Sequence, residues 1–231
     1  MKVGGIQPVT LLDYPKKVAA IIFVSGCNFR CPFCYNPSLV LPELTTKAKL
    51  ISPEDLVVFL KKRKKYLDGL VITGGEPTVD PDLLPFLKQV KKMGYDIKLD
   101  TNGSNPDVLQ AVIDSGLADY LAMDIKGPLD SYEKYCGLKI DPEVLKISIG
   151  LVKNSGLPHE FRSTLIKGYH QTADIESMAQ AIGRAKLYYL QNFVPQKRLV
   201  GQKFSGRIFT PAELGVMKQL AEEYVQECLI R

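Results

Sequence analysis

The chain has 231 residues, of which 45% are hydrophobic and 24% charged, and these ordinary values exclude a collagen-like, mucin-like or wholly disordered protein. Its formal net charge of +5 falls far short of the concentrated basic stripe of a nucleic-acid-binding protein, so we expect no nucleic-acid partner. Five cysteines, three of them clustered, do not form the framework of a secreted disulfide protein, so we expect a cytoplasmic location.

A segment near the N-terminus imitates a lipoprotein signal but is better explained as a buried strand. Lys16 and Lys17 precede a short apolar run, and Cys27 follows it, as in a lipoprotein cleavage box. The run lies at the lower limit of a secretory segment, and the residues before it include an acid and two prolines. Its β-branched residues are typical of a buried parallel strand. No other segment approaches the roughly 18 consecutive apolar residues of a membrane span, so we expect no membrane partner.

Six β-rich runs predict strands, and helical patterns lie between them. The expected strands are 18–25, 69–73, 96–101, 119–123, 160–166 and 188–194. The expected helices are 52–65, 82–93, 106–115, 142–154, 173–186 and 211–228. Because hairpin signals are missing, we expect parallel β/α units wound right-handed, as an open sheet or a barrel. Eight units would need about 250 residues for a closed barrel, so we favour an α/β fold with a partial (β/α)6 TIM-like barrel open on one side.

The same pattern predicts one domain over residues 1–231, with a core at about 15–200 and a last helix at about 211–228. In such folds the reacting groups lie at the carboxyl ends of the strands. Polar residues follow four of the expected strands, and we expect them to face one mouth. They are Cys27 with its neighbours, Gly74 to Glu76, Asp100 to Gly103, and Asp124 with Lys126.

Three cysteines within eight residues form a candidate metal-ligand set. The motif consists of Cys27, Cys31 and Cys34. With five cysteines in a chain of this length, chance would place two more at these offsets from a given cysteine on the order of a few times in ten thousand. Thiolates suit zinc or an iron–sulfur cluster. Structural zinc requires a fourth protein ligand, and no nearby Cys or His supplies one. Three thiolates on a four-iron cluster leave one iron open, so we favour the cluster and keep zinc as the alternative.

The loop C-x3-C-x2-C, with Phe33 before its third cysteine, resembles the signature of the radical S-adenosylmethionine (SAM) superfamily. The resemblance extends over roughly residues 15–200, with further motifs in the family's order. It implies that Cys27, Cys31 and Cys34 hold one [4Fe-4S] cluster, whose fourth iron is chelated by the amine and carboxylate of SAM. In the family, an electron from the cluster breaks the C5′–S bond of SAM and yields a 5′-deoxyadenosyl radical.

Further motifs acquire a role through the same resemblance. The sequence Gly74-Gly75-Glu76 matches the family's GGE motif and implies contact with the SAM amine, although alone it predicts only a tight turn. Asp100 and Asp124 resemble residues of glycyl-radical-enzyme activases, which implies a place near the SAM carboxylate, with a monovalent cation as a further ligand.

Lys126 would contribute charge there, and Arg162 matches an arginine that meets SAM; a helix-capping Asp and a surface Arg are the structural alternatives. One departure concerns a Tyr-His pair of the activases, where this chain has Val194, Pro195 and Gln196 after Phe193. Gln196 would donate a hydrogen bond in place of the imidazole but would not titrate.

Residues 4–15 and the run from Cys34 to Pro37 look most like the activating proteins of anaerobic ribonucleoside-triphosphate reductase. This places Phe33 and Asn36 among the expected cofactor-binding residues and implies a glycyl radical enzyme as partner. A flavodoxin or ferredoxin-like protein is the expected electron donor, given the slight positive charge. The alternatives are a radical SAM enzyme acting on another glycyl radical enzyme or a small molecule, and a zinc-stabilised binding module without catalysis.

Two histidines and two cysteines have no expected role in the site. His159 and His170 lack a partner in recognisable spacing, so we expect ordinary surface or loop histidines. Cys136, and Cys228 on the expected last helix, are interpreted as small buried hydrophobic residues.

Overall fold

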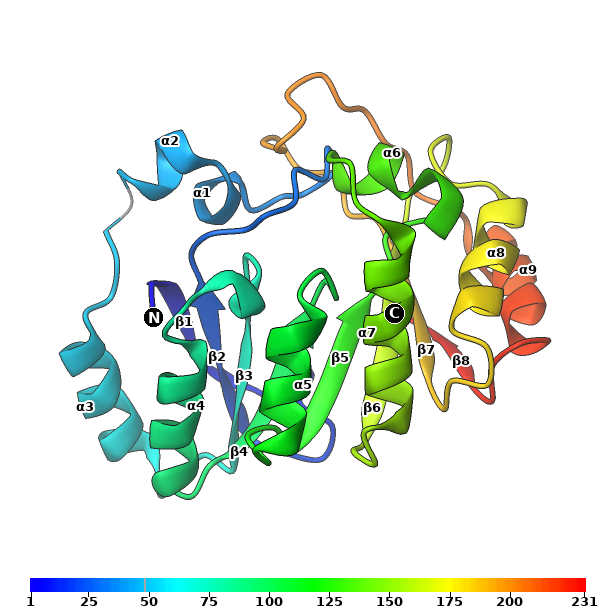
Figure 1. The fold of residues 1–231 in the computed structure, drawn as a ribbon. Helices are drawn as coiled ribbons and strands as arrows, with labels where there is room; N and C mark the ends of the chain where they lie inside the picture. The colour runs from blue at the N-terminus through cyan, green and yellow to red at the C-terminus, as the bar shows by residue number, and fades with distance from the viewer. Residues whose placement is uncertain (48) are drawn as a thin grey trace. The chain divides into compact units, whose positions relative to one another are not determined.

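The computed structural model describes residues 1–47 and 49–231, and strands and helices alternate along most of the chain (Figure 1). The strands are β1 (Val3–Thr10), β2 (Ala19–Val24), β3 (Gly69–Gly74), β4 (Asp96–Thr101), β5 (Tyr120–Asp124), β6 (His159–Leu165), β7 (Tyr188–Asn192) and β8 (Cys228–Ile230). The α-helices are α1 (Pro37–Val40), α2 (Pro42–Thr45), α3 (Pro53–Arg63), α4 (Leu83–Lys92), α5 (Pro106–Asp114), α6 (Tyr132–Cys136), α7 (Pro142–Asn154), α8 (Thr172–Ala181) and α9 (Pro211–Glu222). Two short 3-10 helices are η1 (Pro77–Val79) and η2 (Leu129–Ser131). No helix among the described residues is long and apolar enough to cross a membrane.

The chain forms two compact units, which are described separately. The first unit comprises Met1–Asn28, Asn36–Thr101 and Asp107–Leu121. The second comprises Phe29–Tyr35, Asn102–Pro106 and Ala122–Arg231.

The first unit contains β1 to β4 with α3 and α4 (Figure 1). β2, β3 and β4 are parallel, as their β-branched runs and crossover helices predict, whereas β1 pairs antiparallel with β2. The sequence also explains where α3 begins, because the Ser52 hydroxyl accepts a hydrogen bond from the Asp55 N–H at 3.0 Å and a proline follows the cap. Basic residues end the same helix, where they complement its dipole.

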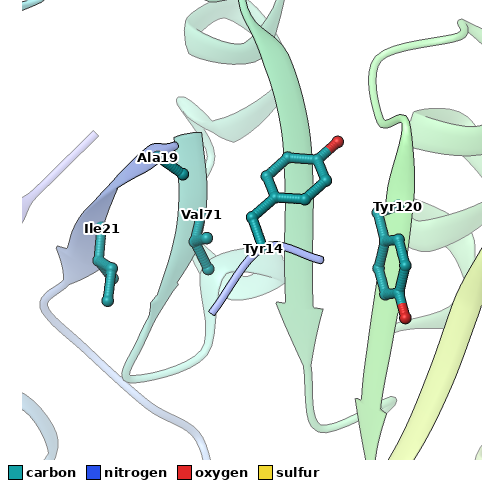
Figure 2. Packing of buried hydrophobic residues seen from close by; sticks show 5 residues of the cluster. All are labelled: Tyr14, Ala19, Ile21, Val71 and Tyr120. Carbon is teal, nitrogen blue, oxygen red and sulfur yellow. The ribbon is translucent and has the colours of Figure 1, made fainter. Parts of the chain in front are cut away.

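A small apolar cluster packs on one side of the first unit's strands (Figure 2). Ala19 and Ile21 are two residues apart on β2 and face the same side, and Ile21 is in register with Val71 of β3. Tyr14 packs against them and meets Tyr120 edge to face, with ring centroids 6.0 Å apart. The segment before β2 therefore closes this part of the core with an aromatic side chain.

The second unit contains β6, β7 and β8, which are parallel, together with α6 to α9. α8 and α9 pack against each other, and α9 also packs on β8 (Figure 1). Thr210 and Glu213 form a capping box at the start of α9, which satisfies the free N–H groups of its first turn.

The predicted fold class is confirmed. The strands follow chain order from β1 to β8, and no pairing between β1 and β8 closes the sheet within the described part of the chain. β2 with β3, β3 with β4, β6 with β7 and β7 with β8 are parallel, whereas β1 with β2 is antiparallel. All six predicted strands are present, with ends displaced by two residues at most. The antiparallel β1 was not predicted, because its two glycines and its proline have low strand propensity.

The predicted last helix at 211–228 is wrong at its C-terminal end. α9 ends at Glu222, and Cys228 lies on β8 instead of on a helix. The chain after α9 pairs with an earlier segment: Arg184 N–H donates to the Tyr224 carbonyl at 2.7 Å, and Tyr188 N–H donates to the Glu227 carbonyl at 3.0 Å. This long-range pairing overrides the helical pattern. The helix predicted at 173–186 likewise ends early, at Ala181.

Candidate functional site

The cysteine loop connects the two units. Cys27 belongs to the first unit, whereas Cys31 and Cys34 belong to the second. None of the three forms a disulfide with another described residue; Cys31 is buried, and the other two are partly exposed. Within the described residues, no group of three or more His, Cys, Asp or Glu side chains is already gathered as for a metal ion. The chemistry of three reduced thiols fits an iron–sulfur cluster.

Backbone hydrogen bonds hold the part of the loop that lies in the second unit. The Arg30 N–H donates to the Cys136 carbonyl at 2.7 Å, and the Cys34 N–H donates to the Cys31 carbonyl at 3.0 Å. These backbone hydrogen bonds fix the turn that carries Cys31 and Cys34, and they therefore restrict the positions of both thiols.

Phe33 is buried in an aromatic cluster of the second unit. Its ring lies 6.1 Å from Tyr169, 6.4 Å from His170 and 6.2 Å from Phe204, measured between centroids. The predicted cofactor-binding residue therefore also anchors the loop. Asn36 lies at the start of α1, where its carbonyl accepts a hydrogen bond from the Leu39 N–H and its side chain makes no capping bond.

The Gly74-Gly75 pair is required by close backbone packing in the first unit. Gly74 has φ of +113°, and a Cβ placed on it would lie 2.5 Å from the Val24 nitrogen. A Cβ on Gly75 would lie 1.9 Å from the Gly26 carbonyl oxygen. Since no side chain fits at either position, packing alone explains the pair, and any contact of their carbonyls with SAM remains a prediction.

Glu76 is buried, and its carboxylate holds the turn after β3. Oε1 accepts hydrogen bonds from the Thr78 N–H at 3.1 Å, the Thr78 hydroxyl at 2.6 Å and the Thr101 hydroxyl at 2.7 Å. The side chain therefore joins the ends of β3 and β4. Its role in the structure is to fix the shape of this turn.

Asp100 is accompanied by a buried lysine that the sequence interpretation missed. The Lys98 ammonium lies 3.4 Å from Asp100 Oδ1 and donates to the Asp13 carbonyl at 2.7 Å. It also lies over the Tyr120 ring. The alternation of Lys98 and Asp100 on β4 would have revealed it, because residues two apart share a face.

Asp124, Lys126 and Arg162 come together in the second unit, and we call them the charged trio. Asp124 Oδ2 accepts from Lys126 Nζ at 2.9 Å, and Oδ1 accepts from Arg162 Nε at 2.8 Å. Their side chains are 28%, 19% and 12% exposed, so solvent reaches all three. The structural alternative of a surface arginine is excluded for Arg162. Two cations and one anion leave the trio with one unit of positive charge, suited to a single carboxylate.

The charged trio is ionised over the whole useful pH range. Burial alone would raise the pKa of Asp124, but Arg162 and Lys126 hold it well below its ordinary value. Burial alone would lower the pKa of Lys126, but the negative charge of Asp124, followed by that of Cys31 as a thiolate, raises it above its ordinary value. The positive charge of the trio is therefore permanent and lies near Cys31.

Glu160 and Arg231 extend the charged trio and were not predicted. Glu160 Oε1 lies 3.8 Å from Arg162 Nη1 and 3.8 Å from Arg231 Nη1, and the Glu160 side chain is fully buried. The Arg231 guanidinium lies 3.6 Å over the Tyr189 ring. The alternation of Glu160 and Arg162 on β6 is the sequence signal for this extension.

His170 lies in the loop between β6 and α8, one of the two expected positions, but it is buried and fixes the backbone beside Lys126, so a surface position is wrong. Its Nδ1 accepts from the Ile166 N–H at 3.1 Å, so its Nε2 must carry the proton that it donates to the Lys126 carbonyl at 2.9 Å. His159 is also buried, at the start of β6. Cys136 and Cys228 are buried as predicted.

Three comparisons place the chain among known proteins. The sequence profile of the Radical SAM superfamily matches residues 21–182. A Methanocaldococcus jannaschii protein named as a candidate glycyl-radical enzyme activating enzyme is 32% identical over 239 aligned positions, covering 99% of this chain and 95% of its own. The pyruvate formate-lyase-activating enzyme of Clostridium pasteurianum is 28% identical over 130 positions, covering 54% of this chain and 52% of its own.

A solved structure supports the same fold. Streptococcus suis SuiB bound to S-adenosylmethionine matches with a TM-score of 0.66 and 15% identity, over 91% of this chain. The chain spans about half of SuiB, or 51%, so this likeness concerns the fold alone. The profile match covers most of the chain, and it includes the cysteine loop and the charged trio. The chain belongs to the radical SAM superfamily.

Proposed function

We propose that this protein cleaves SAM reductively at a [4Fe-4S] cluster and uses the resulting radical to remove a hydrogen atom from a glycine of a partner enzyme. Cys27, Cys31 and Cys34 are the proposed cluster ligands. The partner is a glycyl radical enzyme, and anaerobic ribonucleotide reductase is our first candidate. The observation that supports this most is a full-length relationship, at 32% identity, to a protein named as a candidate activating enzyme of this kind.

The bound cluster would supply one electron to the sulfonium of SAM, which breaks its C5′–S bond. The residues of this chain would bind SAM and orient it. Arg162 and Lys126 offer positive charge to the SAM carboxylate, while Asp124 keeps the two cations side by side. The proposed roles of Gly74, Gly75 and Asp100 are contacts near the SAM amine and carboxylate. A monovalent cation beside the aspartates belongs to the same proposal.

The radical chemistry needs no acid or base from the chain. With the cluster and SAM bound, C5′–S cleavage would release methionine, and the 5′-deoxyadenosyl group would take a hydrogen atom from the glycine Cα to give 5′-deoxyadenosine and a glycyl radical. The protein's task is to hold the reacting atoms in position and to keep other hydrogen donors away. Permanent ionisation of the charged trio fits this task, since a group that never changes protonation serves binding better than proton transfer.

An anaerobic experiment tests the proposal. The protein is reconstituted with iron and sulfide, reduced with dithionite in the presence of SAM, and assayed for 5′-deoxyadenosine. Candidate glycyl radical proteins are then added one at a time, anaerobic ribonucleotide reductase first, and a glycyl radical is sought by electron paramagnetic resonance. We expect four irons per chain, 5′-deoxyadenosine, and a glycyl signal on the true partner.

Two cysteine variants provide a matched control. Cys31→Ala is expected to lose the cluster iron and all 5′-deoxyadenosine formation, whereas Cys136→Ala, which removes a buried thiol outside the motif, is expected to keep both. Wild-type turnover by Cys31→Ala would contradict the assignment. Zinc at one per chain with no iron or sulfide would favour the non-catalytic binding module instead. 5′-Deoxyadenosine without a glycyl radical on any candidate would favour a small-molecule substrate.

A further inference from the structure

The loop after β7 carries a concentration of positive charge. We call residues 194–208 the basic loop; it is orange in Figure 1. Its cations are Lys197, Arg198, Lys203 and Arg207, and no Asp or Glu occurs from 193 to 212. All four side chains are exposed, and within residues 1–47 and 49–231 none of them forms an ion pair. Some cations elsewhere pair with acids, such as Lys17 with Asp96 and Lys91 with Asp119.

The middle of the basic loop is bonded directly to the cysteine loop. The Val200 N–H donates to the Cys34 carbonyl at 2.9 Å, and the Gly201 N–H donates to the Pro32 carbonyl at 2.9 Å. A Cβ on Gly201 would lie 2.9 Å from the Pro32 oxygen, so the two backbones are in close contact. The basic loop thus lies against the segment between two of the proposed cluster ligands.

Aromatic packing and a second pair of hydrogen bonds fix the rest of the loop. Phe204 packs on Phe33, with centroids 6.2 Å apart, and on Tyr169 at 5.0 Å. At the far end, the Lys167 N–H donates to the Arg207 carbonyl at 2.9 Å, and the Arg207 N–H donates back at 3.4 Å. The cations therefore sit on an ordered platform beside Cys34.

We propose that the basic loop is the docking surface for an acidic, low-potential redox protein that delivers the electron used in SAM cleavage. This inference rests on the proposed function, which needs one electron per SAM. In the transfer, a reduced flavin of the donor is oxidised by one electron and the cluster is reduced by one electron. Unpaired positive charge steers an acidic partner to the loop, and contact with the Pro32–Cys34 backbone brings the donor next to the cluster ligands.

The loop also has the apolar contacts that a transient interface needs. Val194 is 61% exposed and Ile208 is 55% exposed, at the two ends of the basic loop. An interface of this kind has an apolar part with a charged rim, so the composition fits brief, salt-sensitive docking. The other basic run of the chain, Lys61 to Lys65 at the end of α3, lies in the first unit and serves as the control.

The test compares two charge reversals in the full chain. One variant carries Lys197→Glu, Arg198→Glu and Lys203→Glu, and the control carries Lys61→Glu and Lys62→Glu. The probe is an acidic flavodoxin. Its affinity is measured by titration at several salt concentrations, and the reduction of the cluster is followed by stopped-flow absorbance, once with reduced flavodoxin and once with dithionite.

We expect the basic-loop variant to lose about tenfold or more in affinity and in the rate of reduction by flavodoxin at low salt, with a smaller difference at high salt. Reduction by dithionite should be unchanged, and the α3 control should resemble the wild type. Unchanged affinity in the basic-loop variant, or an equal loss in the control, would overturn the proposal. A loss of dithionite reduction would show a role in holding the cluster instead of docking.

The two proposals fail separately. A wild-type protein that holds no reducible cluster refutes the proposed function, but the flavodoxin titration still decides whether the basic loop binds an acidic protein. Normal reduction with a loss of glycyl radical formation would identify the basic loop as the surface for the glycyl radical enzyme, which also contradicts electron-donor docking.

Discussion

The two units each hold a lysine–aspartate pair at the end of a strand, and the two pairs differ in their contact with solvent. In the first unit, the Lys98 and Asp100 side chains are 1% and 10% exposed and lie 3.4 Å apart. In the second, Lys126 and Asp124 are 19% and 28% exposed and lie 2.9 Å apart, with Arg162 as a second cation.

The difference in solvent exposure indicates which of the two pairs is accessible to a ligand. The Lys98 ammonium is buried and donates to a backbone carbonyl. Burying an ion costs free energy unless its partners are in place, so Lys98 and its partners depend on each other in the folded structure. The charged trio is partly exposed to solvent, so its desolvation penalty is smaller, and a carboxylate can replace the water that contacts its net positive charge. We therefore expect loss of stability from changes at Lys98 and loss of SAM binding from changes in the charged trio.

The largest effect is expected from Lys98→Ala. The substitution leaves a buried carboxylate without its lysine, which costs roughly 3–5 kcal/mol in the free energy of unfolding. Anaerobic urea unfolding of wild type and variant measures it. Lys98→Met, which keeps the aliphatic stem, is the companion variant and separates packing from charge. A loss below about 1 kcal/mol in Lys98→Ala would mean that the first pair is not structural.

Asp124→Asn is expected to weaken SAM binding by roughly 10–100-fold, because a charge-assisted hydrogen bond contributes about 1.5–3 kcal/mol. Iron content should stay near normal. Calorimetric titration of the reconstituted protein with SAM gives the affinity, and Asp130→Asn, an exposed aspartate on η2, is the control. Unchanged affinity of Asp124→Asn for SAM would contradict the proposal that the charged trio binds SAM.

His170→Leu tests how the second unit supports its charged trio. It removes both hydrogen bonds that hold Ile166 and Lys126, at a cost of about 2 kcal/mol. Burial lowers the pKa of His170 below its ordinary 6.5, despite Asp174, while Lys134 reinforces the shift. The unfolded chain thus takes up a proton before the folded one does, and the wild type loses stability as pH falls below 6.5.

The variant lacks this proton uptake, so its deficit relative to the wild type should shrink below pH 6.5. Denaturant unfolding at pH 8, 6.5 and 5.5 measures the change. A deficit that is constant or grows towards low pH would show that folding does not lower the pKa of His170.

The smallest effects are expected from two helix caps, one in each unit. Ser52→Ala at α3 and Thr210→Ala at α9 each remove one capping hydrogen bond and should cost about 1 kcal/mol. If the chain is one cooperative domain, as its sequence predicts, both variants shift a single calorimetric transition by the same amount. Two transitions, each moved by only one variant, would divide the chain into independent domains.

Some strands could be predicted from the sequence and others could not. Strands β2 to β7 were predicted because short β-rich runs recur between longer helical patterns. β8 was missed because three residues form a strand only through pairing with β7, and β1 was missed because an edge strand tolerates glycine and proline. In the site, the motif residues were found. Lys98 and Glu160 were missed although each has a partner two residues away on its strand, and their other partners, Asp13 and Arg231, are distant in the sequence. His170 was misread because its partner Lys126 is 44 residues away.

The family, the order of the β/α units and the three-cysteine loop can be recognised from the sequence, because periodicity and short spacings are local properties of a chain. The sequence motifs also include Asp124, Lys126 and Arg162. The folded structure was needed to show that these three side chains meet, that Lys98 is buried beside Asp100, and that the basic loop lies against Pro32 and Cys34. The physical reason is that burial and pairing depend on contacts between distant segments, which no local pattern encodes.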